Sequence, residues 1–146
     1  SSTTRRPGID KINGGSIDSR IEPTTDANTA NDIFNLSAIE SIRDVERQTG
    51  NPILPSIFEG FIDQMEDKLE ELRTEVQSGD CTSIYRTAHA IKSMSANIGA
   101  KKIAAIGAKI ETDGRDGNLE HMSVRLQNLN NAFPEFVSKF KTEFVD

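Results

Sequence analysis

His89, Lys92 and Ser93 lie within about one helical turn of one another and form the combination in this sequence that could do chemistry. A neutral imidazole nitrogen is a good nucleophile near pH 7. A lysine three residues later reaches the same helix surface, where its ammonium could neutralise part of a phosphoryl group's charge. A side chain four residues later leans back over the ring, so small Ser93 leaves the imidazole open. This pattern predicts that His89 accepts a phosphoryl group.

A helix over about 81–98 is predicted to carry His89. Its buried stripe recurs at steps of four and three residues and consists of Ile84, Ala88, Ile91, Ser95 and Ile98. His89 lies two residues before Ile91 and therefore points about 200° away from it, at roughly 100° per residue. We expect His89 on the outer face or at its margin, and Gly99 at the helix end in a left-handed conformation. The residues expected around it are Tyr85, Arg86, Lys92, Ser93 and Ala96.

The signature of histidine-containing phosphotransfer (HPt) domains resembles the run His89-Ala90-Ile91-Lys92-Ser93-Met94-Ser95-Ala96-Asn97-Ile98-Gly99-Ala100. That signature typically reads His, any residue, Leu or Ile, Lys, Gly, small residues and then Gly-Ala. Ser93 is the main departure, because the family usually has glycine there. Serine is still small, so we expect it to narrow the access to the His89 imidazole without blocking it. The segment from Ile103 to Glu111 also resembles the next family helix, which usually ends in an acidic or amide residue. The resemblance covers about 32–146, and its specific part is 85–111.

The resemblance implies a phosphorelay intermediate of two-component signal transduction. His89 would accept a phosphoryl group from a receiver-domain aspartate and pass it to another receiver. Lys92 would stabilise the phosphate, and Ser93 would keep it accessible. Tyr85, Arg86 and Ala96 would contribute to the surface that docks the receiver, a domain of a response regulator.

The same resemblance implies that the catalytic groups and Mg²⁺ come mainly from the receiver, so no cofactor is expected in this chain. It favours the C-terminal end of a hybrid sensor histidine kinase as the parent protein over a free-standing shuttle. We therefore expect a cytoplasmic location, either free or at the cytoplasmic end of a membrane-anchored sensor. The start at Ser1 without methionine suggests a fragment of a longer chain or a processed product.

Composition predicts one small all-α domain. The 146 residues are 35% hydrophobic and carry a net charge of −6, which argues against a nucleic-acid binder. No apolar stretch approaches the roughly 20 residues of a membrane-spanning helix. Cys81 is the single cysteine, and two histidines 32 positions apart make no metal-ligand pattern.

The predicted architecture is an antiparallel four-helix bundle with one additional N-terminal helix, over 32–146, preceded by a flexible linker over 1–31. Periodic apolar residues and turn signals place the helices at about 33–49, 53–78, 81–98, 100–113 and from 119 onward.

Several helix ends carry sequence signals of their own. Ser37 and Glu40 could form a capping box for the first helix, and Asn51-Pro52 could open the second. Asp80 is a candidate cap for the histidine helix. Pro134 should kink or restart the last helix. The run from 113 to 118 is expected to be a turn, from which Arg115 could fold back towards His89.

The alternative function is a non-catalytic helical bundle that docks partner proteins. It predicts the same core, and the combination of His89, Lys92 and Ser93 is what distinguishes the two. No phosphate-cradling glycine loop is present, so the chain is not expected to be an enzyme that phosphorylates His89 from ATP. The dimerisation helix of a sensor kinase usually has glutamate after its histidine and a nearby proline, whereas Ala90 follows His89 here.

Overall fold

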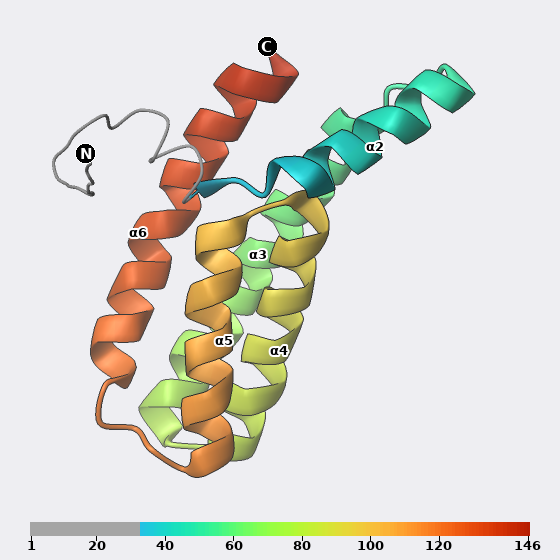
Figure 1. The fold of residues 1–146 in the computed structure, drawn as a ribbon. Helices are drawn as coiled ribbons and strands as arrows, with labels where there is room; N and C mark the ends of the chain where they lie inside the picture. The colour runs from blue at the N-terminus through green and yellow to red at the C-terminus, as the bar shows by residue number, and fades with distance from the viewer. Residues whose placement is uncertain (1–32) are drawn as a thin grey trace, which may run out of the picture. The chain divides into compact units, whose positions relative to one another are not determined.

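A computed structural model describes residues 33–146, which are all-helical apart from one isolated bridge between Phe34 and Ala100. The elements are α2 (Leu36–Thr49), α3 (Ile53–Ser78), α4 (Cys81–Ile98), α5 (Lys101–Asp116), α6 (Met122–Phe140) and a terminal π-helical turn, η1 (Lys141–Val145). Helices α3 to α6 form an antiparallel bundle, and α2 extends away from one end of it (Figure 1). The predicted class, a four-helix bundle with one further N-terminal helix, is confirmed. The predicted linker over 1–31 lies outside the described residues.

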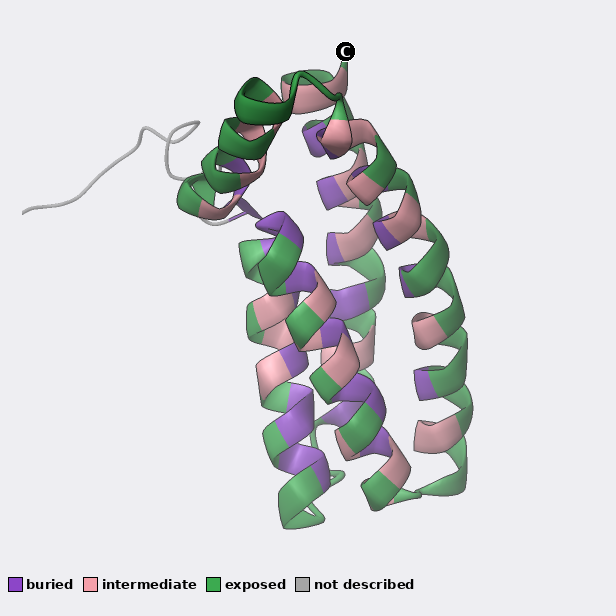
Figure 2. Ribbon diagram, turned by 90° about the vertical axis from the view of Figure 1, so that its right-hand side faces the viewer, coloured by how far each residue is buried: buried purple, intermediate pink, exposed green. Residues whose placement is uncertain are grey.

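Each bundle helix turns one apolar face inward, and exposed residues cover the outer faces (Figure 2). The buried side chains include Leu54, Met65, Leu72, Ile84, Ile91, Ile103, Ile110, Leu129 and Phe136. At the α2 end the core is aromatic, since Phe58 stacks on Phe140 with ring centroids 4.8 Å apart and Phe34 meets Phe136 edge to face. The phenylalanines of α6 are therefore core residues, as their helical spacing predicts.

The two helices of greatest interest begin and end at the predicted residues. Helix α3 covers Ile53–Ser78 and α4 covers Cys81–Ile98. The Asp80 side chain caps α4 by accepting a hydrogen bond from the Ser83 backbone N–H. Gly99 ends α4 with φ +80°, the left-handed conformation that favours glycine.

The predicted caps of α2 and α3 are wrong. Asn35 caps α2, because its side chain accepts a hydrogen bond from the Ala38 N–H, so Ser37 and Glu40 form no capping box. At the start of α3 no cap side chain from Asn51 or Pro52 is used. Instead, the carboxylate of Glu46 on α2 accepts a hydrogen bond from the Leu54 N–H at 2.7 Å. A tertiary contact therefore satisfies a donor that the local sequence leaves open.

Two boundaries near the chain's C-terminal half also differ from the prediction. Helix α5 continues to Asp116, so the expected turn over 113–118 shrinks and Arg115 lies in the last helical turn. Helix α6 begins at Met122 and passes through Pro134 without a new start. Packing explains α5, because Asp113 and Gly114 are buried against neighbouring helices rather than exposed in a loop.

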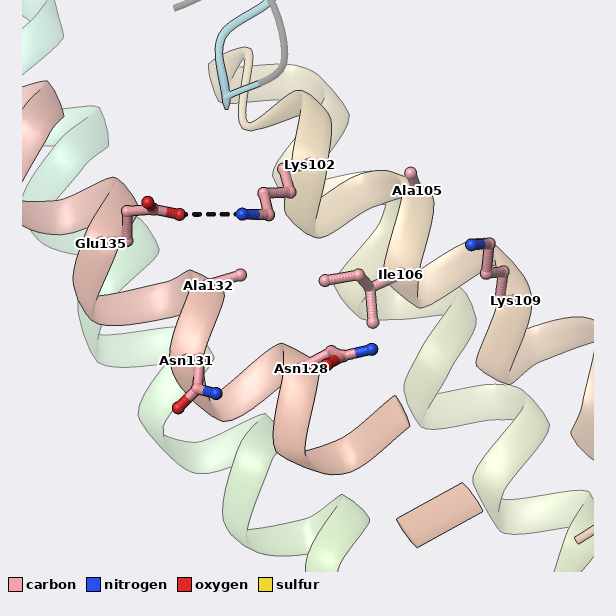
Figure 3. Close-up of a pocket in the computed structure, with 8 residues that line it drawn as sticks. All are labelled: Lys102, Ala105, Ile106, Lys109, Asn128, Asn131, Ala132 and Glu135. Atoms are coloured by element: carbon pink, nitrogen blue, oxygen red, sulfur yellow. Dashed lines mark hydrogen bonds and ion pairs between the residues drawn. The ribbon is translucent and has the colours of Figure 1, made fainter. Parts of the chain in front are cut away.

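Helices α5 and α6 are joined at two levels by ion pairs. Lys102 pairs with Glu135 at 3.1 Å near one end, and Asp113 pairs with Arg125 near the other. Between these levels lies an open groove of about 580 Å³, with Ile106 and Ala132 facing each other across it (Figure 3). Within residues 33–146, no helix is long and apolar enough to cross a membrane.

Gly99 allows a paired test of the contact that seats α2 on the bundle. A Cβ at residue 99 would lie 2.8 Å from the Asn35 carbonyl oxygen and 2.8 Å from Ile39 Cγ1, whereas one at Gly50 would meet nothing within 4 Å. Both glycines have positive φ. We expect Gly50→Ala to lower the free energy of unfolding by about 1 kcal/mol, the cost of the left-handed conformation. Gly99→Ala should cost about 1–3 kcal/mol more, because it adds overpacking.

Urea unfolding of both variants measures this difference. Equal losses of stability would show that the segment around Asn35 moves aside without cost.

Candidate functional site

The imidazole of His89 lies on the outer surface of α4 with 56% of its side chain exposed. Ala88 and Ile91 on the same helix are fully buried, so they hold α4 in the rotation that turns His89 outward. The ring of Tyr85, one turn earlier, stacks against the imidazole at a centroid distance of 6.3 Å. Ser93, one turn later, is exposed and adds no bulk over the ring.

Glu111 on α5 holds the other side of the imidazole. Its Oε2 lies 2.7 Å from His89 Nδ1, and its Oε1 lies 2.6 Å from Lys92 Nζ. The Glu111 side chain is only 9% exposed, so one buried carboxylate bridges the two predicted site residues. An ionised carboxylate can only accept hydrogen bonds, and Nδ1 must therefore carry the proton of the neutral ring. The lone pair is then on Nε2, the nitrogen not held by Glu111.

The charge state of Glu111 follows from its neighbours. The hydrogen bond from the Lys92 ammonium lowers the pKa of the Glu111 carboxyl most strongly, burial opposes this, and the hydrogen bond with His89 lowers it further. The net effect is a pKa below the ordinary value of 4.5. Glu111 is therefore ionised at neutral pH.

Two glycines bring α5 close enough for this contact. A Cβ at Gly107 would lie 3.3 Å from the Lys92 backbone nitrogen, and one at Gly114 would lie 3.0 Å from the Tyr85 backbone nitrogen. Glu111 stands between them, four residues after the first and three before the second, on the same face of α5. Side chains at either glycine would push the helices apart, so the glycine spacing sets the distance between Glu111 and His89.

The structure brings together only some of the predicted site residues. His89, Tyr85 and Lys92 form one cluster with Glu111. Lys92 is 38% exposed and engaged with Glu111 rather than free in solvent. The remaining predicted residues, Arg86, Ser93 and Ala96, are exposed on the same helix.

Arg115 does not contact His89 and pairs instead with its neighbour Asp116 at 3.7 Å. It lines a small pocket beside Tyr85.

Reasoning from the sequence missed Glu111 as a site residue. One signal could have identified it: Glu111 is the acidic residue that ends the segment resembling the next family helix, and it lies between Gly107 and Gly114. Within residues 33–146, no group of three or more His, Cys, Asp or Glu side chains could hold a metal ion. The cluster of an exposed imidazole, a buried carboxylate and a lysine thus fits nucleophilic chemistry at Nε2.

Comparisons with known proteins identify the family and the fold of the chain. The family model described as Hpt domain matches residues 56–139, more than half of the chain. The crystal structure of histidine-containing phosphotransfer protein B (HptB) from Pseudomonas aeruginosa PAO1 is 24% identical, covers 75% of this chain and 92% of its own, and superposes with a TM-score of 0.67. That likeness supports the fold. No curated protein matches the chain.

The family match decides the class of function. Hpt domains are phosphotransfer modules without a kinase site of their own, and they interact with the receiver domains of response regulators. The chain belongs to the Hpt family, the histidine phosphotransfer domains of two-component phosphorelays.

Proposed function

We propose that His89 is the phosphoryl acceptor of this Hpt domain, taking the group from the aspartyl phosphate of one receiver and passing it to another. One observation carries the proposal: a half-exposed imidazole whose Nδ1 is held at 2.7 Å by a buried, ionised carboxylate. This contact leaves Nε2 as the nucleophile.

The transfer step follows from that arrangement. The Nε2 lone pair attacks phosphorus, the N–P bond forms, and the P–O bond to the receiver aspartate breaks, so that the carboxylate leaves with the electron pair. Nδ1 keeps its proton, and the ring becomes a phosphorylated imidazolium. Glu111 stabilises this developing positive charge, since its carboxylate is already in place. In the reverse direction, a receiver carboxylate attacks phosphorus and the neutral imidazole leaves.

Lys92 has two tasks in this proposal. Its ammonium holds Glu111 through Oε1, which keeps the carboxylate ionised and oriented. An ammonium has three donors, and Lys92 is part-exposed, so a remaining N–H is available to an oxygen of the phosphoryl group. The Mg²⁺ that balances the rest of the phosphoryl charge would be held by the receiver.

The surface around His89 would dock the receiver. Ser93 and Ala96 are small and exposed, which leaves space beside the imidazole, while Tyr85 and Arg86 flank its other side. A shallow groove of about 250 Å³ between α3 and α4 continues this face. Its lining includes Ile57, Phe61, Met94, Asn97 and Ile98. It would supply the apolar part of the docking surface.

The family resemblance also supports proposals on the cellular location of the domain and on its parent protein. We place the domain in the cytoplasm and at the C-terminal end of a hybrid sensor histidine kinase. Kinase and receiver segments upstream of residue 1 in the full-length gene product would support this parent; a gene product consisting of this domain alone would contradict it.

Substitution of the two histidines tests the acceptor. On mixing with a phosphorylated receiver domain, the wild type should acquire acid-labile, alkali-stable label. His89→Gln should acquire none, because the nucleophile is gone. The matched control is His121→Gln, at the exposed start of α6, which should label like the wild type. Label on His89→Gln, or no label on the wild type with several receivers, would favour a non-catalytic interaction module.

Lys92→Ala and Glu111→Gln test the two supporting groups. Each removes a charge-assisted hydrogen bond of about 1.5–3 kcal/mol, so we expect transfer about tenfold to a hundredfold slower. Glu111→Gln keeps an acceptor for Nδ1 and should be the milder change. Rapid-quench measurement of label transfer gives the rates, and circular dichroism checks that the fold is intact. Unchanged rates in Lys92→Ala would remove its electrostatic role.

Lys92→Met should raise the pKa of the Glu111 carboxyl, because it removes the largest cause of the lowering. In the wild type, the lowered pKa of Glu111 stabilises the folded state at pH values above the ordinary pKa of 4.5. This stabilisation is lost as the pH falls through the lowered pKa. In Lys92→Met that loss should begin at higher pH. Carboxyl ¹³C NMR titration measures the pKa, and urea midpoints across the acid range measure the stability. Identical titrations in both proteins would contradict the assigned cause.

A further inference from the structure

The pocket beside Tyr85 has no place in the transfer step described above. We propose that it is a subsite that receives one acidic side chain of the receiver domain docked on His89. Its walls come from Thr82 and Tyr85 on α4 and from Gly114 and Arg115 on α5. The inference rests on the proposed function of His89 and adds to it a contact that selects the partner.

The position of the pocket separates it from the phosphoryl group. Tyr85 lies one helical turn before His89, about 5.4 Å along the axis. Its ring stacks against the imidazole and also lines the pocket, whereas His89 does not line it. Tyr85 therefore lies between the two. A side chain of the docked receiver that entered the pocket would therefore lie close to the transferred phosphoryl group but apart from it.

The size and origin of the pocket suit a single side chain. Its volume is about 280 Å³, slightly below the roughly 300 Å³ lower limit of typical small-molecule sites. Gly114 in its wall packs closely against the backbone of Tyr85, which holds the α4 and α5 walls of the pocket together. Arg115, the next residue of α5, also lines the pocket, and its side chain is largely exposed.

The polar side chains that line the pocket favour a carboxylate as the group bound there. Arg115 presents a planar fork of donors that matches a carboxylate, and the Thr82 hydroxyl adds a further donor. The present ion-pair partner of Arg115 is Asp116 at 3.7 Å, with both side chains about 60% exposed. Such a pair contributes about 0–1 kcal/mol and yields readily to a partner's carboxylate.

The other two cations near His89 interact with acidic residues away from this pocket. Lys92 is bound to Glu111, and Arg86 acts on the cap residue Asp80, whose pKa it helps to lower after the hydrogen bonds from Ser83. Neither Lys92 nor Arg86 lines the pocket, whereas Arg115 does, so Arg115 is the cation that an acidic side chain entering the pocket would meet.

Arg115→Glu tests the subsite with two phosphoryl donors. With a phosphorylated receiver we expect the apparent KM to rise about tenfold, the loss of one hydrogen-bonded contact to a charged group, with little change in the maximal rate. With phosphoramidate, a small donor that needs no docking surface, labelling of His89 should be unchanged. Lys139→Glu, the same charge change at an exposed site on α6, should affect neither reaction.

Thr82→Val provides a second variant that keeps every charge. It should raise the apparent KM by a few fold through loss of the hydroxyl donor. Added salt should raise the wild-type KM towards that of Arg115→Glu, because an exposed ion pair is screened.

The outcomes are distinct. Slower labelling of Arg115→Glu by phosphoramidate would mean that Arg115 acts on the phosphoryl group, and would overturn the docking subsite. An unchanged KM with the receiver would overturn it as well. Failure of the wild type to label at His89 with either donor would instead overturn the proposed function.

Discussion

The contact of Glu111 with both His89 and Lys92 is the interaction on which the site depends. One buried carboxylate fixes the tautomer of the imidazole and holds the nearest ammonium. Without it, the histidine would be an exposed side chain with either nitrogen free to react. Burial makes the carboxylate effective, since a low local dielectric strengthens its interaction with an imidazolium. Burial also makes it depend on Lys92, because a buried carboxylate without a partner is costly.

That contact in turn requires α4 and α5 to pack unusually closely. Gly107 and Gly114 remove the side chains that would separate the helix backbones, and each lies within reach of an α4 backbone nitrogen. The same pair of positions shapes two features of the face. Between them, Glu111 reaches His89; beside the second, Arg115 is brought to the rim of the pocket at Tyr85. The close packing of α4 and α5 therefore positions Glu111 against the reacting imidazole and forms the surface that holds the proposed subsite.

The opposite side of α5 has a different role. There, Lys102 pairs with Glu135 of α6 at one end of an open groove (Figure 3). Asp113 pairs with Arg125 of α6 nearer the other end of the two helices. Helix α5 thus packs closely on α4 through its glycines, whereas an open groove and ion pairs lie between α5 and α6. A domain that presents one fixed nucleophile needs rigidity mainly where the imidazole is held. The aromatic cluster at the α2 end adds to the apolar core that the bundle helices share.

The sequence by itself determined the all-α class, the bounds of α3 and α4, and the outward direction of His89. These follow from local rules, namely the helical period, the Asp80 cap and the glycine stops at residues 79 and 99. Only the tertiary structure decided that Glu111 is the partner of His89, that Lys92 is engaged before any phosphate arrives, and that Arg115 lies in a helix beside Tyr85. Each of these depends on how closely two helices approach. That distance is set by packing between different helices, which the periodicity of one chain segment does not encode.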